Sequence, residues 1–222
     1  MKTLVSWSSG KDSAWMVHLL RQRHDIRLGG LLTTINEPAQ RVAMHAVRVD
    51  LLQAQAGALG LPLWLVPIPS PCPNDAYEGA MRTAVARAVR EEFTHVAFAD
   101  LFLQDIRRYR EDKLAGSGLT PLFPLFDSDT AALARTMIAA GLRARITCLD
   151  PRQLDRRFAG REFDSTLLAE LPAPVDPCGE RGEFHTFAYD GPMFARPIPI
   201  ETGTTVERDG FVFTDLQIER AR

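Results

Sequence analysis

The chain has 222 residues, of which 45% are hydrophobic, enough for one large domain or for one domain and a smaller lobe. Its formal net charge is −2 with no block of like charge, so bulk electrostatics do not suggest a nucleic-acid partner. The three cysteines, Cys72, Cys148 and Cys178, lie far apart, which argues against a disulfide framework and a Cys/His zinc site. The chain opens on an apolar strand, without a signal peptide or a membrane-length apolar run, so we expect a cytoplasmic protein without a membrane partner.

Short β-like runs alternate with helical patterns in the first half of the chain. Strands are predicted at Thr3–Trp7, Leu28–Thr34, Leu63–Ile68 and His95–Ala99. Helices are predicted between them, near Ser13–His24, Ala43–Leu59 and Ala76–Glu92. This alternation is typical of βαβ units, so we expect an α/β fold with a doubly wound, mostly parallel sheet.

The second half is less regular. It holds predicted helices at Gln104–Ala115 and Thr130–Ala140, an extended connector at 121–126, and a strand at Ala144–Leu149. After Glu183 the pattern is β-like, and the Asp209-Gly210 turn predicts a hairpin of 204–207 with 211–214. We therefore expect a nucleotide-binding domain at residues 1–118 and a smaller α+β substrate lobe at 119–222.

The most informative stretch is the small-residue turn between the first strand and the first helix. Its backbone N–H groups and the helix start favour an anion such as phosphate. Lys11 adds a positive charge and is expected to be exposed, whereas Asp12 is available for a magnesium ion or a ligand hydroxyl. The predicted binding residues of this turn are Ser8, Ser9, Gly10, Lys11, Asp12 and Ser13.

Two other phosphate motifs do not fit this turn. It lacks the G-x-x-x-x-G-K-[ST] pattern of the Walker loop, and it has too few glycines for a dinucleotide G-x-G-x-x-G turn. A serine-rich helix cap is the structural alternative, but a cap gives no reason for Gly-Lys-Asp-Ser directly after a strand.

Further polar residues follow other strands of the predicted sheet. Thr33 ends the second strand, His45 follows its loop, and Asp100 follows the fourth strand. Ligands of parallel sheets bind beyond the carboxyl ends of the strands, so these three residues are predicted to contact the nucleotide. For His45, a helix-surface position is an equally good interpretation.

A second constellation lies between Gly179 and His185. The glycines permit a tight backbone path, which brings the ionisable side chains close together. In a strand that begins at Glu183, the side chains of Glu183 and His185 would lie on the same face. We predict that Glu180, Glu183 and His185 act with Lys11 in catalysis, by orienting a substrate or moving a proton. A glycine-rich surface loop is the alternative, and Cys178 is interpreted as a small buried residue.

Three segments in matching order resemble one family. They are Ser8-Ser9-Gly10-Lys11-Asp12-Ser13, the stretch from Asp100 to Glu111, and Cys178-Gly179-Glu180-x-x-Glu183-Phe184-His185. Together they are similar to the diphthine–ammonia ligase-like branch of the PP-loop ATP pyrophosphatases, whose usual loop is S-G-G-K-D-S. In this chain Ser9 replaces the first glycine of that pair.

The resemblance implies an adenine nucleotide alpha-hydrolase-like fold and an AMP-forming amide ligase. ATP with Mg²⁺ would adenylate a carboxylate, small or protein-borne, and ammonia would then displace AMP. Two other classes remain open, a tRNA-modifying PP-loop enzyme and a nucleotide-binding regulator without turnover. A homo-oligomer is compatible with the sequence.

Overall fold

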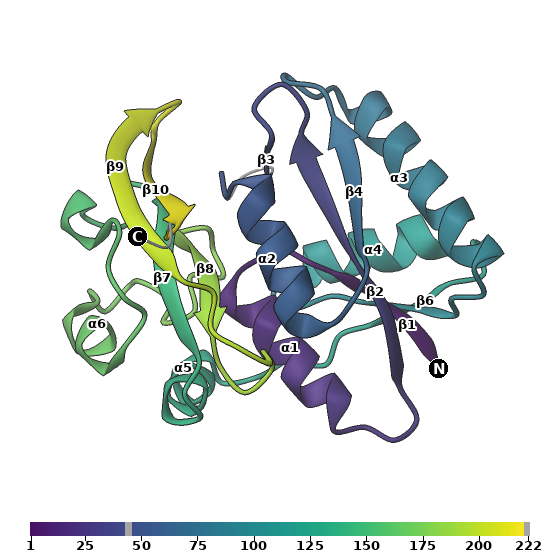
Figure 1. Cartoon of the computed structure of the whole chain (residues 1–222), viewed down its shortest axis with the longest axis horizontal. Coiled ribbons are helices and arrows are strands. Elements are labelled where there is room, and N and C mark those ends of the chain that lie inside the picture. Colours follow the sequence, from purple (N-terminus) through teal and green to yellow (C-terminus); the bar gives the residue numbers. More distant parts are fainter. Residues whose placement is uncertain (43–45, 220–222) are drawn as a thin grey trace.

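The computed structural model describes residues 1–42 and 46–219 and contains two β-sheets (Figure 1). The first sheet is built from β1 (Lys2–Ser6), β2 (Arg27–Asn36), β3 (Arg41–Val42), β4 (Leu63–Ile68), β5 (His95–Ala97) and β6 (Thr120–Leu122). The second is built from β7 (Arg143–Leu149), β8 (Phe184–Asp190), β9 (Ile200–Arg208) and β10 (Phe211–Ile218). The helices are α1 (Lys11–Arg21), α2 (Val49–Leu59), α3 (Asn74–Arg90), α4 (Gln104–Leu114), α5 (Thr130–Ala139) and α6 (Ser165–Glu170), with a 3₁₀ turn at Arg156–Phe158.

The first sheet is parallel except for one short strand. β1 lies between β2 and β5, β4 pairs with β2, and β6 pairs with β5, all in parallel. Only β3 runs antiparallel, against the last two residues of β2. The prediction of a mostly parallel α/β sheet is therefore confirmed.

Helices cover both faces of this sheet. Neighbouring residues of its central strand face opposite sides, so each face has a core of its own. Leu4 packs in a core with α3 and α4, whereas Val5 packs in a larger core with α1, α2 and the second sheet. In Figure 1, α1 and α2 lie between the two sheets, while α3 and α4 lie on the side of the first sheet away from the second. The second sheet thus shares its core with the first half of the chain.

The predicted domain boundary lies beside β6. The predicted division after residue 118 precedes Thr120–Leu122, and this strand pairs with β5 of the first sheet. Pro121 has no N–H to donate, which is tolerated because β6 is the edge strand of the sheet. The second sheet begins only at β7.

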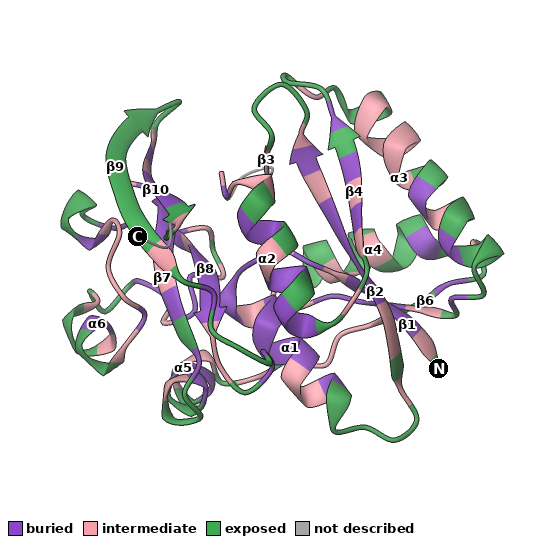
Figure 2. Ribbon diagram, viewed as in Figure 1, coloured by how far each residue is buried: buried purple, intermediate pink, exposed green. Residues whose placement is uncertain are grey.

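The second sheet is antiparallel, in the order β8-β7-β10-β9. The predicted hairpin is present and longer than expected, with Asp209 and Gly210 both at positive φ in its turn. Nearly all of β9 is exposed (Figure 2). The other edge strand, β8, faces the first half of the chain, where Ala188 N–H donates to the carbonyl of Ser9. Among the described residues, no helix combines the length and the apolar character needed to cross a membrane.

Candidate active site

The turn after β1 is held compact by its own serines. Gly10 is the N-cap residue of α1, and its N–H donates to Ser8 Oγ at 3.3 Å. The Ser13 hydroxyl donates to Gly10 O at 3.1 Å and lies 3.0 Å from Ser8 Oγ. These bonds bend the chain so that the first turn of α1 faces the carboxyl edge of the sheet, where a helix start favours an anion.

β8 closes this turn from the second lobe. Lys11 N–H donates to Thr186 Oγ1 at 3.1 Å, across 175 residues of sequence. A Cβ at Gly10 would lie 3.2 Å from the carbonyl oxygen of Thr186, closer than most such contacts. Glycine therefore allows the strand and the turn to approach each other at this point.

The amide of Gln55 joins the turn to both sheets. This side chain of α2 is fully buried. Its Oε1 accepts a hydrogen bond from Trp7 Nε1, while its Nε2 donates to the carbonyls of Ser9 and Ala188 at 2.9 and 2.6 Å. All the polar atoms of one buried amide thus fix the position of the loop.

Lys11 is buried, with 1% of its surface exposed, in contrast to the exposed lysine that we expected. Its ammonium group donates to Asp12 Oδ2 at 2.9 Å and to the carbonyl of Cys178, and it lies 5.3 Å from the ring centroids of Phe163 and Phe184. Burial by itself lowers the pKa of Lys11, but the charge and hydrogen bond of Asp12, together with the nearby Cys178 and Glu180, outweigh it, so the pKa is raised and the lysine stays charged.

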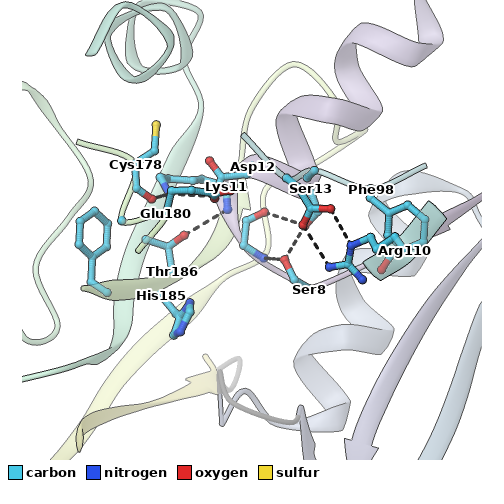
Figure 3. Close-up of a pocket in the computed structure, with 16 residues that line it drawn as sticks. Ser8, Lys11, Asp12, Ser13, Phe98, Arg110, Cys178, Glu180, His185 and Thr186 are labelled. Atoms are coloured by element: carbon cyan, nitrogen blue, oxygen red, sulfur yellow. Dashed lines mark hydrogen bonds and ion pairs between the residues drawn. The ribbon is translucent and has the colours of Figure 1, made fainter. Parts of the chain in front are cut away.

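A cavity of about 260 Å³ opens over the turn. Figure 3 shows the side chains around it, with Arg110 beside Phe98 on one side and Glu180, Thr186 and His185 on the other. The predicted residues that line it are Ser8, Gly10, Lys11, Asp12, Ser13, Asp100, Glu180 and His185. The structure thus brings most of the two predicted constellations together in one cavity.

Glu180 and His185 are both changed by burial. Burial raises the pKa of Glu180 to about 7, although the N–H of Leu101, which donates to Glu180 Oε1 at 2.7 Å, acts in the opposite direction. Burial also lowers the pKa of His185 to about 4, and the charge of Lys11 adds to this effect. Near neutral pH, Glu180 can therefore gain or lose a proton, whereas His185 is neutral.

Three predicted residues do not line the cavity. Ser9 is fully buried at φ +70°, and its hydroxyl has no hydrogen-bond partner among the described residues. Thr33 is buried and donates to the carbonyl of Trp7 at 2.7 Å. Glu183 precedes β8 and accepts from the N–H groups of Asp176 and Arg181, each at 2.9 Å, so it holds the 176–183 loop in shape. His45 lies outside the described residues.

The cavity also contains residues that the sequence did not single out as a site. Thr186 directly follows His185 on β8, and its hydroxyl accepts a hydrogen bond from the turn at Lys11 N–H. Arg110 lies on α4, where it makes two hydrogen bonds to Asp100 at 2.6 and 3.1 Å. The signal for Arg110 was its place in the Asp100–Glu111 segment that carries the family resemblance, but the charges of this segment also fit a solvated helix face.

Known protein families match the N-terminal and the C-terminal part of the chain, and both parts contribute residues to this cavity. The family of diphthamide synthase N-terminal domains matches residues 1–69, and that of diphthamide synthase C-terminal domains matches residues 129–221. The diphthine–ammonia ligase of Danio rerio is 34% identical over 93% of this chain and 89% of its own length. The chain belongs to the diphthine–ammonia ligase family. Diphthine–ammonia ligases of Rattus norvegicus and Homo sapiens are 28% and 27% identical, each over 97% of this chain and 89% of their own length.

Membership of the diphthine–ammonia ligase family agrees with the geometry of the cavity. The turn from Ser8 to Ser13 lies within the N-terminal match, and Glu180 and His185 lie within the C-terminal match. Asp100 and Arg110 lie between the two matches, on β5–α4. The cavity is therefore assembled from all three parts of the chain.

Proposed function

We propose that this protein is an ATP-dependent, AMP-forming amide ligase, which adenylates a carboxylate and transfers ammonia to it. The observation that carries the proposal is the closure of a lysine-containing phosphate turn by a lobe that brings Glu180 and His185 to the same cavity. Its relatives are named as ligases of diphthine and ammonia, which adds an acceptor acid and a nitrogen donor to the proposal.

The turn suits the departure of pyrophosphate. Serine hydroxyls, the first turn of α1 and the charged Lys11 surround one end of the cavity. As the carboxylate attacks the α-phosphorus, negative charge grows on the β-phosphate oxygens, and the positive charge of Lys11 and the start of α1 stabilise it. The turn keeps a fixed position for this role, because Gln55 and Thr186 both hold it through hydrogen bonds.

Asp12 fits a magnesium ion that accompanies ATP. Its Oδ1 atom is buried and has no hydrogen-bond partner among the described residues, while its Oδ2 atom binds Lys11. Magnesium commonly uses one or two carboxylates together with substrate phosphates, so a single available oxygen is sufficient. The ion would neutralise phosphate charge when bound.

Glu180 is placed to move a proton in the second half of the reaction. Attack of ammonia on the adenylate leaves a proton on nitrogen that a base must remove. A carboxyl group with a pKa of about 7 can accept this proton near neutral pH, and Glu180 lines the cavity. The neutral His185 lines the same cavity and can help to orient a substrate.

The products of ATP turnover test this function. The purified protein is incubated with ATP, magnesium, ammonium and a panel of carboxylic acids, and the nucleotides are separated by chromatography. We expect AMP and pyrophosphate that depend on the acid. ADP as the main product would contradict the proposal, and ATP binding without any turnover would favour a nucleotide-binding regulator.

A matched pair of variants tests the role of Glu180. Glu180→Gln should lower the turnover number by about 10²–10⁴-fold, because it removes the proton acceptor and keeps the shape of the side chain. Its affinity for ATP, measured by calorimetry, should stay near that of the wild type. The control is Glu201→Gln on the exposed strand β9, which should leave both values unchanged.

A further inference from the structure

A second, larger cavity opens between α3 and α4, with a volume of about 540 Å³. It shares Phe98 and Arg110 with the cavity over the turn from Ser8 to Ser13, so the two cavities adjoin at these side chains. We propose that this groove, the α3–α4 groove, binds the apolar body of a small acceptor acid, whose carboxylate lies at Arg110. The inference rests on the proposed ligase function and adds to it the class of acceptor.

The inner wall of the groove is apolar and aromatic. Met81, Val85 and Leu114 form part of it, together with Phe98. Two tyrosines flank it, Tyr77 from the first turn of α3 and Tyr109 from α4. A pocket of this size with a few polar groups suits a small molecule of mainly apolar character.

The charges around the groove are largely neutralised by one another. Glu78 binds Lys113 at 2.7 Å and lies 3.9 Å from Arg82. Asp112 is exposed to solvent. A ligand therefore meets no strong field of one sign along the groove, and an uncharged body enters with little electrostatic cost.

Arg110 is the charged group at the junction of the two cavities. Its guanidinium lies 4.4 Å from the ring centroid of Phe98 and binds both carboxylate oxygens of Asp100. Those bonds use two N–H groups, whereas a guanidinium has five. The remaining donors can hold an acceptor carboxylate beside the phosphate turn.

The nucleoside of ATP is the competing occupant. A ribose carries hydroxyl groups that each need a hydrogen-bond partner when buried. Met81, Val85 and Leu114 offer none from their side chains, so a ribose packed against this inner wall would leave hydroxyl groups unpaired, whereas polar side chains such as Ser117 line other parts of the groove. The same wall favours a hydrocarbon or aromatic body.

Binding of simple probes tests the proposal without turnover. The full chain, ¹⁵N-labelled and with magnesium and a non-hydrolysable ATP analogue, is titrated with 3-phenylpropanoate and with acetate, and the free protein is titrated with adenosine. We expect 3-phenylpropanoate to shift the amide signals of α3 and α4 and to bind about 10- to 100-fold more tightly than acetate, as burial of a phenyl group implies. Equal binding of the two acids, or shifts of the same signals by adenosine, would overturn the assignment.

A variant with a large side chain in the groove provides a second test of the proposal. Ala86 lines the groove on the exposed side of α3, so Ala86→Trp places a ring there without entering the core. This variant should weaken 3-phenylpropanoate binding at least tenfold and leave the affinity for the ATP analogue unchanged. The control Ala139→Trp, at an exposed position of α5, should change neither. Unchanged acid binding in Ala86→Trp contradicts the proposal.

The two proposals can fail separately. If no acid supports AMP formation but 3-phenylpropanoate still binds through α3 and α4, the ligase function is refuted and the groove remains a ligand site. If acids support AMP formation but Ala86→Trp leaves the KM for every acid unchanged, the ligase function stands and the groove is not the acceptor site.

Discussion

Ser9 is expected to destabilise the folded protein, and replacing it with glycine should reverse this effect. The residue has a Cβ atom at φ +70°, a conformation that glycine adopts freely. It is also fully buried, and its hydroxyl has no partner among the described residues. Ser9→Gly removes both the backbone strain and the unpaired hydroxyl, while the carbonyl that accepts from Gln55 and Ala188 remains.

The two contributions can be added as orders of magnitude. A left-handed conformation costs a residue with a Cβ atom roughly 1–2 kcal/mol. A buried polar group without a partner costs roughly 1–3 kcal/mol. The glycine itself lowers the stability by roughly 0.5–1 kcal/mol, because it gives the unfolded chain more conformational freedom. The free energy of unfolding of Ser9→Gly should thus rise by about 3 kcal/mol, which corresponds to about 6–12 °C in Tm for a chain of this size.

Urea unfolding of three proteins separates the two causes. Ser9→Ala removes the hydroxyl but keeps a Cβ atom at positive φ, so it should gain less than Ser9→Gly. The order of midpoints should be glycine, then alanine, then wild type, with equal m-values. If the glycine variant is less stable than the wild type, the reasoning about Ser9 is refuted. If the alanine variant is as stable as the glycine variant, the backbone conformation at position 9 is not a source of strain.

Three further outcomes follow from buried groups of the site. Lys11→Met should cost about 3–5 kcal/mol of stability, because it leaves the Asp12 carboxylate buried without its partner, and adding Asp12→Asn should restore much of the loss in urea unfolding. Equal stability of the single and double variants would show that the pair is not coupled. Glu180→Gln should be more stable than the wild type above pH 7 but not near pH 4.5: the raised pKa means that the protonated carboxyl stabilises the fold at low pH, and that this contribution is lost as the pH rises through about 7. Thermal unfolding across this range checks the sign, and a constant difference contradicts it. Gln55→Leu should lower the unfolding free energy by about 2–5 kcal/mol, since it removes the three hydrogen bonds that this buried amide makes with Trp7 Nε1 and with the carbonyls of Ser9 and Ala188, whereas substitution of the exposed Gln53 by leucine on the same helix should change little.

Elements with a strong local pattern were predictable. The strand predicted at Leu63–Ile68 matches β4 residue for residue, and the helix predicted at Gln104–Ala115 matches α4 to within one residue. β6 was expected only as part of an extended connector, because three residues around Pro121 have too little pattern to show that they pair with β5. Its pairing depends on the position of β5, which no local signal contains.

The site was predictable where residues are adjacent in sequence. The turn from Ser8 to Ser13 depends on neighbouring residues, and the structure places most of it around one cavity. Glu183 illustrates the limit: its alternation with His185 required a strand that included both, but β8 begins at Phe184. Thr33 shows another, since which side chains of β2 face the cavity depends on where Trp7 lies.

The bond between Lys11 N–H and Thr186 also bears on the order of events during biosynthesis. The turn from Ser8 to Ser13 is synthesised well before its partner, because Thr186 follows Lys11 by 175 residues. A nascent chain can form β1, α1 and β2 early, but it cannot close the turn before β8 has left the exit tunnel. Such a distant contact slows folding, because a long loop must close before the contact can form. Tight ATP binding should therefore appear late in translation, and truncated chains that end before β8 should not compete for the nucleotide.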